Sequence, residues 1–297
     1  MRVLVLGGAG FVGRHAVTAL LARGHDVVIG SRHPQRVGHR LPAQAHQCDR
    51  LSVQFDQLLS IEKWAPLLAG VDVVINCVGI LRQRGLETYE KVHHIAPVAL
   101  AEACSRAGVQ RMLHVSALGL DNRVTSRFLT SKRRGEAGLR DCSFDCVIVR
   151  PSLLDGSDGY GARWFRSVAR WPIHVLPASA KGRIAPLDVG DLGIALAVLC
   201  ELETLPSLEI ELGGDEQMTI GQYLTRLRWQ QRGALARPAL MISVPHWLAR
   251  GVSHLCDLFH ITPFSFGHLQ LMRQDNVPGR NALPKLLNQS RLKKSLA

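Results

Sequence analysis

Short apolar runs alternate along this chain with segments in which apolar residues recur at helical spacing. The runs are typical of strands buried on both faces of a sheet. They lie at 3–6, 26–30, 71–79, 111–116 and 145–149, and a further strand is expected at 43–48. Helices are expected at 11–21, 58–68, 89–107 and 127–139. Alternation of strand and helix predicts an α/β fold, a Rossmann-like doubly wound parallel sheet with right-handed crossovers.

The pattern changes at Arg150-Pro151, where proline ends the sixth predicted strand. A glycine-rich loop at 155–161, helices at 189–200 and 219–232 and a strand-like run at 207–212 follow. We therefore predict three parts: a dinucleotide-binding domain over 1–150, a mixed substrate or partner lobe over 151–240, and a helical tail over 241–297 packed on the lobe. Since ligands of such sheets bind beyond the carboxyl ends of the strands, the lobe should form the substrate side.

One helix of the tail, expected at 243–260, is strongly amphipathic. Pro245 suits its first turn. Its apolar residues then fall along one stripe: Trp247, Leu248, Val252, Leu255, Cys256 and Phe259. The stripe favours a helix that faces the core. The alternative is a helix that docks on a membrane or a large complex, helped by the basic tail at 291–294.

Composition places the chain among ordinary globular proteins, with 46% hydrophobic and 20% charged residues. The seven cysteines are odd in number and form no C-x-x-C pair, which favours a reducing, cytoplasmic setting and no metal site. Met1-Arg2 leads directly into the first strand, so we expect no cleavable signal peptide. No apolar run approaches 18 residues, so we expect no transmembrane helix, although attachment to the inner face of a membrane stays open.

The formal net charge of +12 narrows the choice of partners. Arginines are scattered along the chain, and no basic face with interleaved aromatic residues or helix-turn-helix pattern indicates nucleic acid. An anionic membrane surface, an acidic partner of a membrane complex or a phosphorylated ligand would suit this charge. A solvated, arginine-rich surface is the alternative.

Glycines dominate the stretch that joins the first strand to the first helix. Gly7, Gly10 and Gly13 allow a tight turn and a close approach of backbone to ligand, and Phe11 and Val12 begin the helix. The free N–H groups at the start of that helix favour a pyrophosphate. This glycine pattern between a strand and a helix predicts a dinucleotide site.

The ends of the following strands extend the predicted cofactor site. Ser31 and Arg32 end the second strand where NAD-binding folds place a carboxylate for the ribose, so we predict NADP(H) in preference to NAD(H). Arg36, His39 and Arg40 add positive charge there, while an Arg32 that merely sits in solvent is the alternative. Asp49 should reach the adenine edge, and Val78 and Gly79 should pass close to the cofactor at the tip of the fourth strand.

These motifs, in this order, resemble the extended and atypical branches of the short-chain dehydrogenase/reductase superfamily over residues 1–215. The motifs are Gly7-x-x-Gly10-x-x-Gly13, Asn76-Cys-Val-Gly79, the run 114–119, Ser131-Lys132 with Gly135-Glu136, Val149-Arg-Pro151, and the run 186–191. The runs 211–214 and 244–248 and Asp275-Asn276 resemble a narrower group. That group is the nucleotide-binding accessory subunit of respiratory complex I and its bacterial relatives.

The resemblance implies a catalytic tyrosine four residues before a lysine, with an upstream serine. Ser116 and Lys132 occupy the serine and lysine positions, and Pro151 falls at a cofactor-contacting position. Phe128 stands where the tyrosine belongs, and phenylalanine has no hydroxyl with which to exchange a proton. Tyr160 or the pair His93 and His94 could supply a proton instead, although histidines without chemistry on a helix surface are commoner.

Two functions therefore follow from the sequence. The first is an NADP(H)-dependent oxidoreductase in which Ser116 orients a small substrate and Lys132 holds the nicotinamide ribose. The second is a non-catalytic nucleotide-binding subunit, assembly factor or redox sensor of a membrane complex such as a respiratory NADH:quinone oxidoreductase. Phe128 favours the second, whereas the intact glycine turn, Ser116 and Lys132 favour the first.

Overall fold

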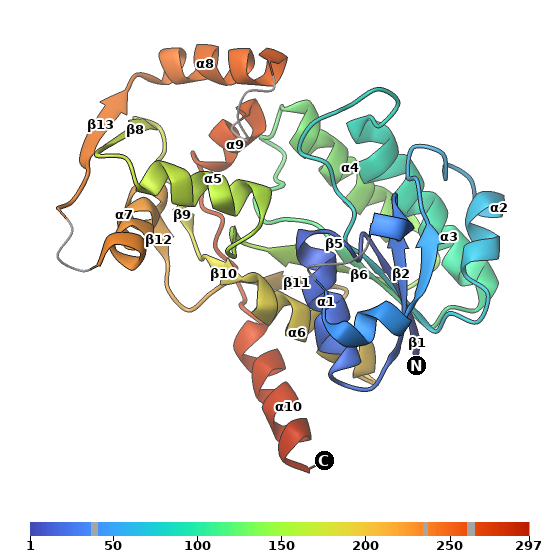
Figure 1. The fold of residues 1–297 in the computed structure, drawn as a ribbon. Helices are drawn as coiled ribbons and strands as arrows, with labels where there is room; N and C mark the ends of the chain where they lie inside the picture. Colours follow the sequence, from blue (N-terminus) through green and yellow to red (C-terminus); the bar gives the residue numbers. More distant parts are fainter. Residues whose placement is uncertain (37–40, 234–236, 260–264, 297) are drawn as a thin grey trace.

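A parallel sheet forms the centre of the computed structural model, which describes residues 1–36, 41–233, 237–259 and 265–296. Within that range the sheet has seven strands in the order β11-β6-β5-β4-β1-β2-β3, and every neighbouring pair is parallel (Figure 1). The strands are β1 Arg2–Leu6, β2 Asp26–Ser31, β3 Asp49–Ser52, β4 Val73–Asn76, β5 Arg111–Val115, β6 Cys146–Pro151 and β11 Glu209–Leu212. The predicted fold class is confirmed.

Helices cover both faces of this sheet. Val3 and Val5 of β1 pack into a core with α1 (Phe11–Leu21) and α6 (Val189–Glu201). Leu4 and Leu6 point to the opposite face, where α2 (Ile61–Trp64), α3 (Ala96–Ala107) and α4 (Arg127–Asp141) lie. Because both faces are buried, the strand carries apolar residues without alternation.

Two predicted boundaries differ from the structure. The strand expected at 43–48 is wrong: Ala43–Gln47 is a 3₁₀ helix, and β3 begins only at Asp49. The sheet domain also extends past residue 150, because β11 pairs with β6 and α6 packs along α1. The last helix, α10 (Leu283–Leu296), packs on α6 and so belongs with this domain rather than with the lobe.

The lobe is built from short sheets and two packed helices. Helix α5 (Tyr160–Ala169) contacts α7 (Ile220–Arg232) through Phe165 and Tyr223. Two-stranded sheets pair β7 (Leu154–Asp155) with β10 (Leu187–Asp188), β9 (Arg183–Ile184) with β12 (Met218–Thr219), and β8 (Ile173–Pro177) with β13 (Leu240–Val244). Buried Arg228 of α7 donates hydrogen bonds to the carbonyls of Ala169, Arg170, Trp171 and Arg237, which joins the end of α5 to the segment before β13.

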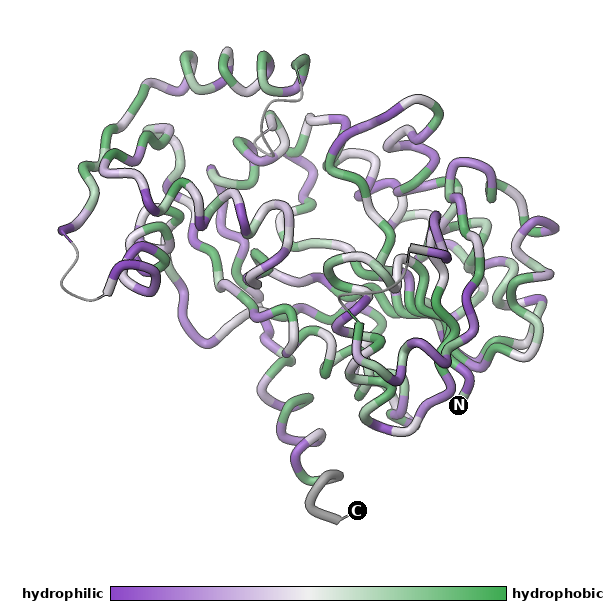
Figure 2. The backbone as a smooth tube through the Cα atoms, viewed as in Figure 1, coloured by the Kyte–Doolittle hydropathy of each residue, from purple (hydrophilic) through white to green (hydrophobic). Residues whose placement is uncertain are grey.

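Helix α8 (His246–Phe259) does not face the core, so the favoured interpretation of its apolar stripe was wrong. Of its residues, all described, two are buried, Ala249 and Ser253, whereas Trp247 is 74% and Leu258 71% exposed. The helix lies along the outer edge of the lobe (Figures 1 and 2). The short helix α9 (Phe266–Leu271) packs beneath it. Among the described residues, no helix has the length and hydropathy needed to cross a membrane.

A π-helical turn at Lys91–Ile95 precedes α3 and fixes the position of α4. A Cβ added at Gly135 of α4 would lie 1.9 Å from the carbonyl oxygen of His93, so the two backbones meet in direct contact. The residues one turn earlier in α4, Ser131 and Lys132, are thereby held beside the π-turn. Such turns are frequently found at functional sites.

We expect Gly135→Ala to lower the free energy of unfolding by about 2 kcal/mol, because the new methyl group would collide with backbone that no rotamer change can move. Gly251→Ala is the matched control, since a Cβ there meets nothing within 4 Å. This control should be neutral or more stable by up to about 1 kcal/mol, because alanine is the better helix former. Urea denaturation of the three proteins measures both effects. Equal stability of Gly135→Ala and wild type would contradict the contact.

Candidate functional site

A cleft of about 530 Å³ opens at the carboxyl ends of β1, β2, β4 and β5. Ten of the residues predicted for the site line it: Gly7, Gly10, Phe11, Val12, Ser31, Arg32, Val78, Gly79, Ser116 and Lys132. Three predicted residues, Gly13, Asp49 and Pro151, do not. The structure therefore brings ten of the thirteen predicted residues together in one cleft.

The glycine turn holds its shape through backbone contacts. Gly7 has a φ of +73° and donates a hydrogen bond to the carbonyl of Gly30 at 2.9 Å, and Gly10 donates to the carbonyl of Gly7 at 2.8 Å. A Cβ at Gly13 would lie 2.2 Å from the Gly7 carbonyl oxygen, so Gly13 allows α1 to pack on the turn and need not touch a ligand. Gly10 also leaves the start of α1 without a side-chain cap, so its first N–H groups face the cleft.

The loop before α5 closes over the start of α1. Arg14, buried in α1, forms an ion pair with Asp158 of this loop. A Cβ at Gly156 or Gly159 would lie within 2.9 Å of the Phe11 ring, so the loop packs directly on that side chain. Tyr160, at the end of the loop, lines the cleft and is 53% exposed. The sequence indicated the loop but not the buried Arg14–Asp158 pair that anchors it.

The end of β2 carries the predicted Arg32, which is not simply solvated. Its Nη1 donates to both carboxylate oxygens of Glu87, at 2.9 and 2.8 Å. Glu87, from the segment after β4, also lines the cleft and was missed by the sequence analysis, because nothing in the sequence places this surface loop beside β2. The side chain of Arg32 is 59% exposed, so it remains accessible to an anion. His39 and Arg40 lie outside the described residues.

Asp49 was wrongly predicted to reach adenine. It is the first residue of β3 and pairs in register with Val28, at the amino end of the sheet opposite the cleft. Its carboxylate accepts a 2.5 Å hydrogen bond from Arg2 there. The error followed from the misplaced strand: had the strand ended at residue 48, residue 49 would have stood at its carboxyl tip.

Asn76 and His93 shape the backbone that follows β4. The Asn76 amide accepts from the N–H of Val78 at 3.0 Å and donates to Nδ1 of His114 at 3.0 Å. Nε2 of His93 accepts from the N–H of Ile80 at 3.1 Å, so Nδ1 carries the proton and donates to Ser131 Oγ at 2.9 Å. With both ring nitrogens engaged, His93 positions backbone and is neither a surface histidine nor a proton shuttle. His94 pairs with Glu90.

Lys132 is the buried cation of the site. A Cβ at Gly79 would lie 3.9 Å from its Nζ, so the ammonium sits beside the tip of β4. Burial lowers the pKa of Lys132 to about 8. Burial and the nearby Lys132 charge lower the pKa of His114 to about 3 and that of His93 well below its usual range. Both histidines therefore stay neutral at pH 7, and Lys132 carries the positive charge.

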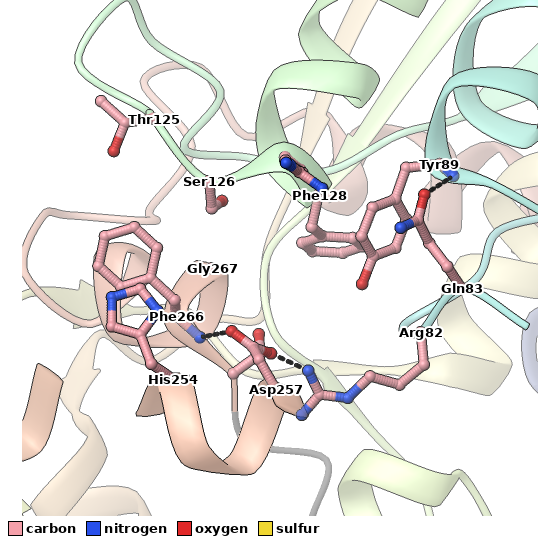
Figure 3. Close-up of a pocket in the computed structure, with 12 residues that line it drawn as sticks. Arg82, Gln83, Tyr89, Thr125, Ser126, Phe128, His254, Asp257, Phe266 and Gly267 are labelled. Carbon is pink, nitrogen blue, oxygen red and sulfur yellow. Dashed lines mark hydrogen bonds and ion pairs between the residues drawn. The ribbon is translucent and has the colours of Figure 1, made fainter. Parts of the chain in front are cut away.

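Phe128 stands in an aromatic cluster in place of the family tyrosine. Its ring meets those of Tyr89 and His93 edge-on, each at 5.6 Å between centroids, and stacks on His268 at 6.0 Å. Tyr89 and Phe128 lie together at the side of a further cavity of about 460 Å³ (Figure 3). Burial lowers the pKa of His268 to about 4, so this imidazole too is neutral at pH 7.

An apolar pocket of about 250 Å³ adjoins the cleft. Residues of α4, β6, α5, α7 and α9 line it, among them Pro151, Phe165, Ile220 and Leu271. Pro151, expected at the cofactor, thus lies on this neighbouring pocket. Pocket and cleft share Ser116, Phe128, Lys132 and Leu154. The Ser116 Oγ is buried and has no hydrogen-bond partner among the described residues, so it is available to a ligand.

A dinucleotide fits these residues. The glycine turn leaves room where a Cβ would stand, the start of α1 offers N–H groups to a pyrophosphate, and Lys132 lies beside Gly79. Tyr160 and Ser31 also line this cleft. Among the described residues, no group of three or more His, Cys, Asp or Glu side chains lies together as metal ligands would.

Comparison with known proteins agrees with this geometry. A family model described as NAD(P)H-binding matches residues 7–167. The chain belongs to this NAD(P)H-binding family. The protein has the same fold as UDP-glucose 4-epimerase from Thermus thermophilus, whose structure is a complex with NAD, at a TM-score of 0.63. The two are 18% identical, and the match covers 98% of this chain and 93% of the epimerase chain. This likeness concerns the fold, and it supports the resemblance to atypical short-chain dehydrogenases/reductases.

Two curated relatives differ in their functions. A ceramide reductase from Caulobacter vibrioides is 31% identical over 211 residues, 70% of this chain and 63% of that protein. The mitochondrial NADH dehydrogenase [ubiquinone] 1 alpha subcomplex subunit 9 of Dictyostelium discoideum is 26% identical over 221 residues, 74% of this chain and 61% of that protein. The chain thus spans somewhat less than two thirds of either relative. One relative is named as a reductase and the other as a complex I subunit, the two kinds of protein between which the sequence did not decide.

We expect Lys132→Met to stabilise the ligand-free protein by about 3 kcal/mol at pH 7, because a cation whose folded pKa falls from 10.5 to about 8 opposes folding. The unfolded lysine binds a proton that the folded one releases between pH 8 and 10.5. The penalty is therefore full below pH 8 and disappears as the pH rises to 10.5. Urea denaturation across this range measures the difference between variant and wild type.

Exposed Lys285 of α10 supplies the control, since Lys285→Met should change stability little at any pH. A Lys132→Met protein that is less stable than wild type at pH 7, or a difference that does not vary with pH, would contradict the buried-cation interpretation.

Proposed function

We propose that this protein is an NADP(H)-dependent oxidoreductase acting on a substrate with an apolar body and one polar reacting group. One observation carries the proposal: the apolar pocket meets the nucleotide cleft at Ser116 and Lys132. The unpartnered Ser116 hydroxyl lies at this junction, where an alcohol or carbonyl oxygen would satisfy it. The name of the Caulobacter relative, a ceramide reductase, supports reduction of a lipid-like substrate.

The residues at the junction divide the chemistry between them. A bound nicotinamide supplies the hydride for the carbonyl carbon, and the carbonyl oxygen requires a proton. Ser116 orients and polarises that oxygen through a hydrogen bond. Lys132 holds the ribose hydroxyls. Its pKa of about 8 also suits the ammonium to donate a proton near neutral pH, whereas Phe128 has no proton to donate. Its neighbours His93, His114 and His268 are neutral and therefore do not compete for this role.

Arg32 supports the preference for NADP(H). Guanidinium is a strong partner for a 2′-phosphate, and an exposed ion pair such as Arg32–Glu87 is worth at most about 1 kcal/mol, so a phosphate can displace the carboxylate. Glu87 weakens this preference, because its negative charge repels a 2′-phosphate and competes with it for Arg32.

We expect NADPH to bind more tightly than NADH, and Arg32→Ala to weaken NADPH binding roughly tenfold or more while leaving NADH nearly unchanged. Glu87→Gln should strengthen NADPH binding, because it removes the competing charge. Calorimetric titration gives the dissociation constants. The control is Arg123→Ala, which removes another exposed arginine, paired with Asp121 and absent from the lining of the cleft. Equal or tighter binding of NADH to wild type would overturn the preference.

A second function rests on Phe128 itself. With the family tyrosine replaced and the ring enclosed by Tyr89, His93 and His268, the site holds a nucleotide with no tyrosine at the proton-transfer position. The complex I relatives from Dictyostelium and Mus musculus support a nucleotide-binding subunit, assembly factor or redox sensor of a membrane complex. The two proposed functions differ in whether the protein catalyses a reaction.

We expect wild type to oxidise NADPH with apolar ketones or quinones and Ser116→Ala to lower kcat/KM about 100-fold, because the hydrogen bond to the developing oxyanion is lost. Phe128→Tyr should raise the rate by restoring a proton donor. Absorbance at the nicotinamide band follows the reaction, with Ser105→Ala, on the exposed side of α3, as control. Tight NADPH binding with no turnover by wild type or Phe128→Tyr would refute the proposed oxidoreductase and support the non-catalytic nucleotide-binding subunit.

A further inference from the structure

The outer side of the lobe exposes an unusual amount of apolar surface. Strands β8 and β13 and helix α8 supply it, and we call this surface the outer face. Its exposed side chains are Ile173, Val175, Leu240, Ile242, Trp247, Leu248, Val252, Leu255, Leu258 and Phe259. They follow one edge of the molecule (Figures 1 and 2). Contiguous apolar patches of this kind mark interaction sites in folded proteins.

Helix α8 is oriented opposite to an ordinary surface helix. At 100° per residue, its exposed apolar side chains, from Trp247 to Phe259, span an arc of about 140°. The two buried residues, Ala249 and Ser253, are small and lie beside this arc, toward the protein. Because α8 turns its small residues toward the protein and its large apolar residues outward, its apolar face is suited to contact an apolar surface outside this chain.

The strand pair continues the same surface. In the parallel register Ile173 lies opposite Leu240 and Val175 opposite Ile242, so the four side chains share one face of the pair. All four are at least 40% exposed. Strand β13 ends at Val244, and α8 begins at His246, so strand and helix adjoin through a single residue, Pro245.

The charge of the residues around the outer face indicates which kind of partner binds it. The outer face comes from two sequence segments, 159–187 and 217–259, which hold five Lys or Arg residues each and one acidic residue, Asp257, which is paired with Arg82. Arg228 is buried, and seven of the basic residues are exposed: Arg163, Arg170, Lys181, Arg183, Arg232, Arg237 and Arg250. A second copy of the chain would bring two such basic surfaces together, which is unfavourable. A bilayer containing anionic lipid offers both an apolar interior and a negative surface.

We propose that the outer face docks the protein on an anionic phospholipid bilayer, with α8 lying in the plane of the interface. At 14 residues α8 is about 21 Å long, too short to span a bilayer and suited to lie along it. Trp247 near its start belongs to the residue type that favours the headgroup region, and the exposed arginines of the two segments, such as Arg237 and Arg250, contact anionic headgroups. This docking is independent of the proposed reaction.

The docked helix also forms a wall of the cavity beside Phe128. His254 and Asp257 of α8 line this cavity together with Phe266 of α9 and Tyr89 (Figure 3). Phe128 lines this cavity, the apolar pocket and the nucleotide cleft alike. Docking therefore brings the membrane within one helix thickness of the cavity beside Phe128, whose ring also lines the apolar pocket. If the proposed function holds, an apolar substrate would approach the site from the lipid side.

Flotation of the full-length protein with liposomes tests the proposal. We expect the protein to float with vesicles of phosphatidylglycerol and phosphatidylcholine, and much less with phosphatidylcholine alone. Leu255→Asp/Leu258→Asp should reduce the partition coefficient at least tenfold. The matched control, Leu208→Asp/Leu292→Asp, adds the same charge at exposed leucines outside the outer face, one just before β11 and one in α10, and should float like wild type.

Circular dichroism and NADPH titration verify that both double variants are folded and retain the cofactor site. Failure of wild type to float with anionic vesicles, or equal flotation of the two double variants, would overturn the proposal. Equal binding to neutral and anionic vesicles would overturn the assignment to an anionic surface. A stable dimer in light scattering that Leu255→Asp/Leu258→Asp dissociates, without any vesicle binding, would assign the outer face to a second copy instead.

Discussion

The structure depends on how closely other backbone can approach helix α1. Gly13 lets the helix rest on the carbonyl of Gly7, and on the far side a Cβ at Gly193 of α6 would lie 2.6 Å from the backbone of His15. The loop before α5 lies against Phe11 at its start. The glycine turn that precedes α1 and two segments distant in sequence, α6 and the loop before α5, thus meet α1 at positions where added side chains would hold them apart. This contact aligns the first N–H groups of α1 with the cleft and brings the lobe over it.

Whereas the contacts of α1 stabilise the fold, Lys132 lowers its stability, because its charge is buried. Its neighbours do not neutralise it at close range: His93 and His114 are neutral, and Glu136 is bound by Arg140 and Arg150. A protein keeps such a cation when a ligand uses it, since strained or desolvated groups concentrate at functional sites. In both proposed functions Lys132 would hold the nucleotide, because this role needs no proton donor at Phe128.

Much of the sheet and of the cofactor site could be predicted because the signals are local. Val3 to Leu6 are apolar on both faces, and the glycines follow at once, so strand, turn and helix can be identified together. Asp49 failed because a boundary error of a few residues moves a side chain to the other end of the sheet. Glu87 could not be found, because its pairing with Arg32 depends on where a surface loop folds.

Helix α8 illustrates a different limit. Periodicity identified its apolar stripe correctly, but a stripe specifies which residues share a side and not what that side faces. Only the tertiary contacts of Ala249 and Ser253 decide the question. The same holds for His93: its place in a helix was evident, whereas its hydrogen bond to Ile80 depends on the π-turn and on the close packing of Gly135.

The segment after β4 connects two parts of the molecule. Arg82 forms an ion pair with Asp257 of α8, and five residues later Glu87 binds Arg32 at the cofactor cleft. A nucleotide that displaces Glu87 therefore acts on the same short stretch of chain that holds α8 in place. By thermodynamic linkage, whatever α8 binds must alter nucleotide affinity by the same factor by which nucleotide alters the binding of α8. The segment would thus couple occupancy of the nucleotide site, in either redox state, to the binding of α8.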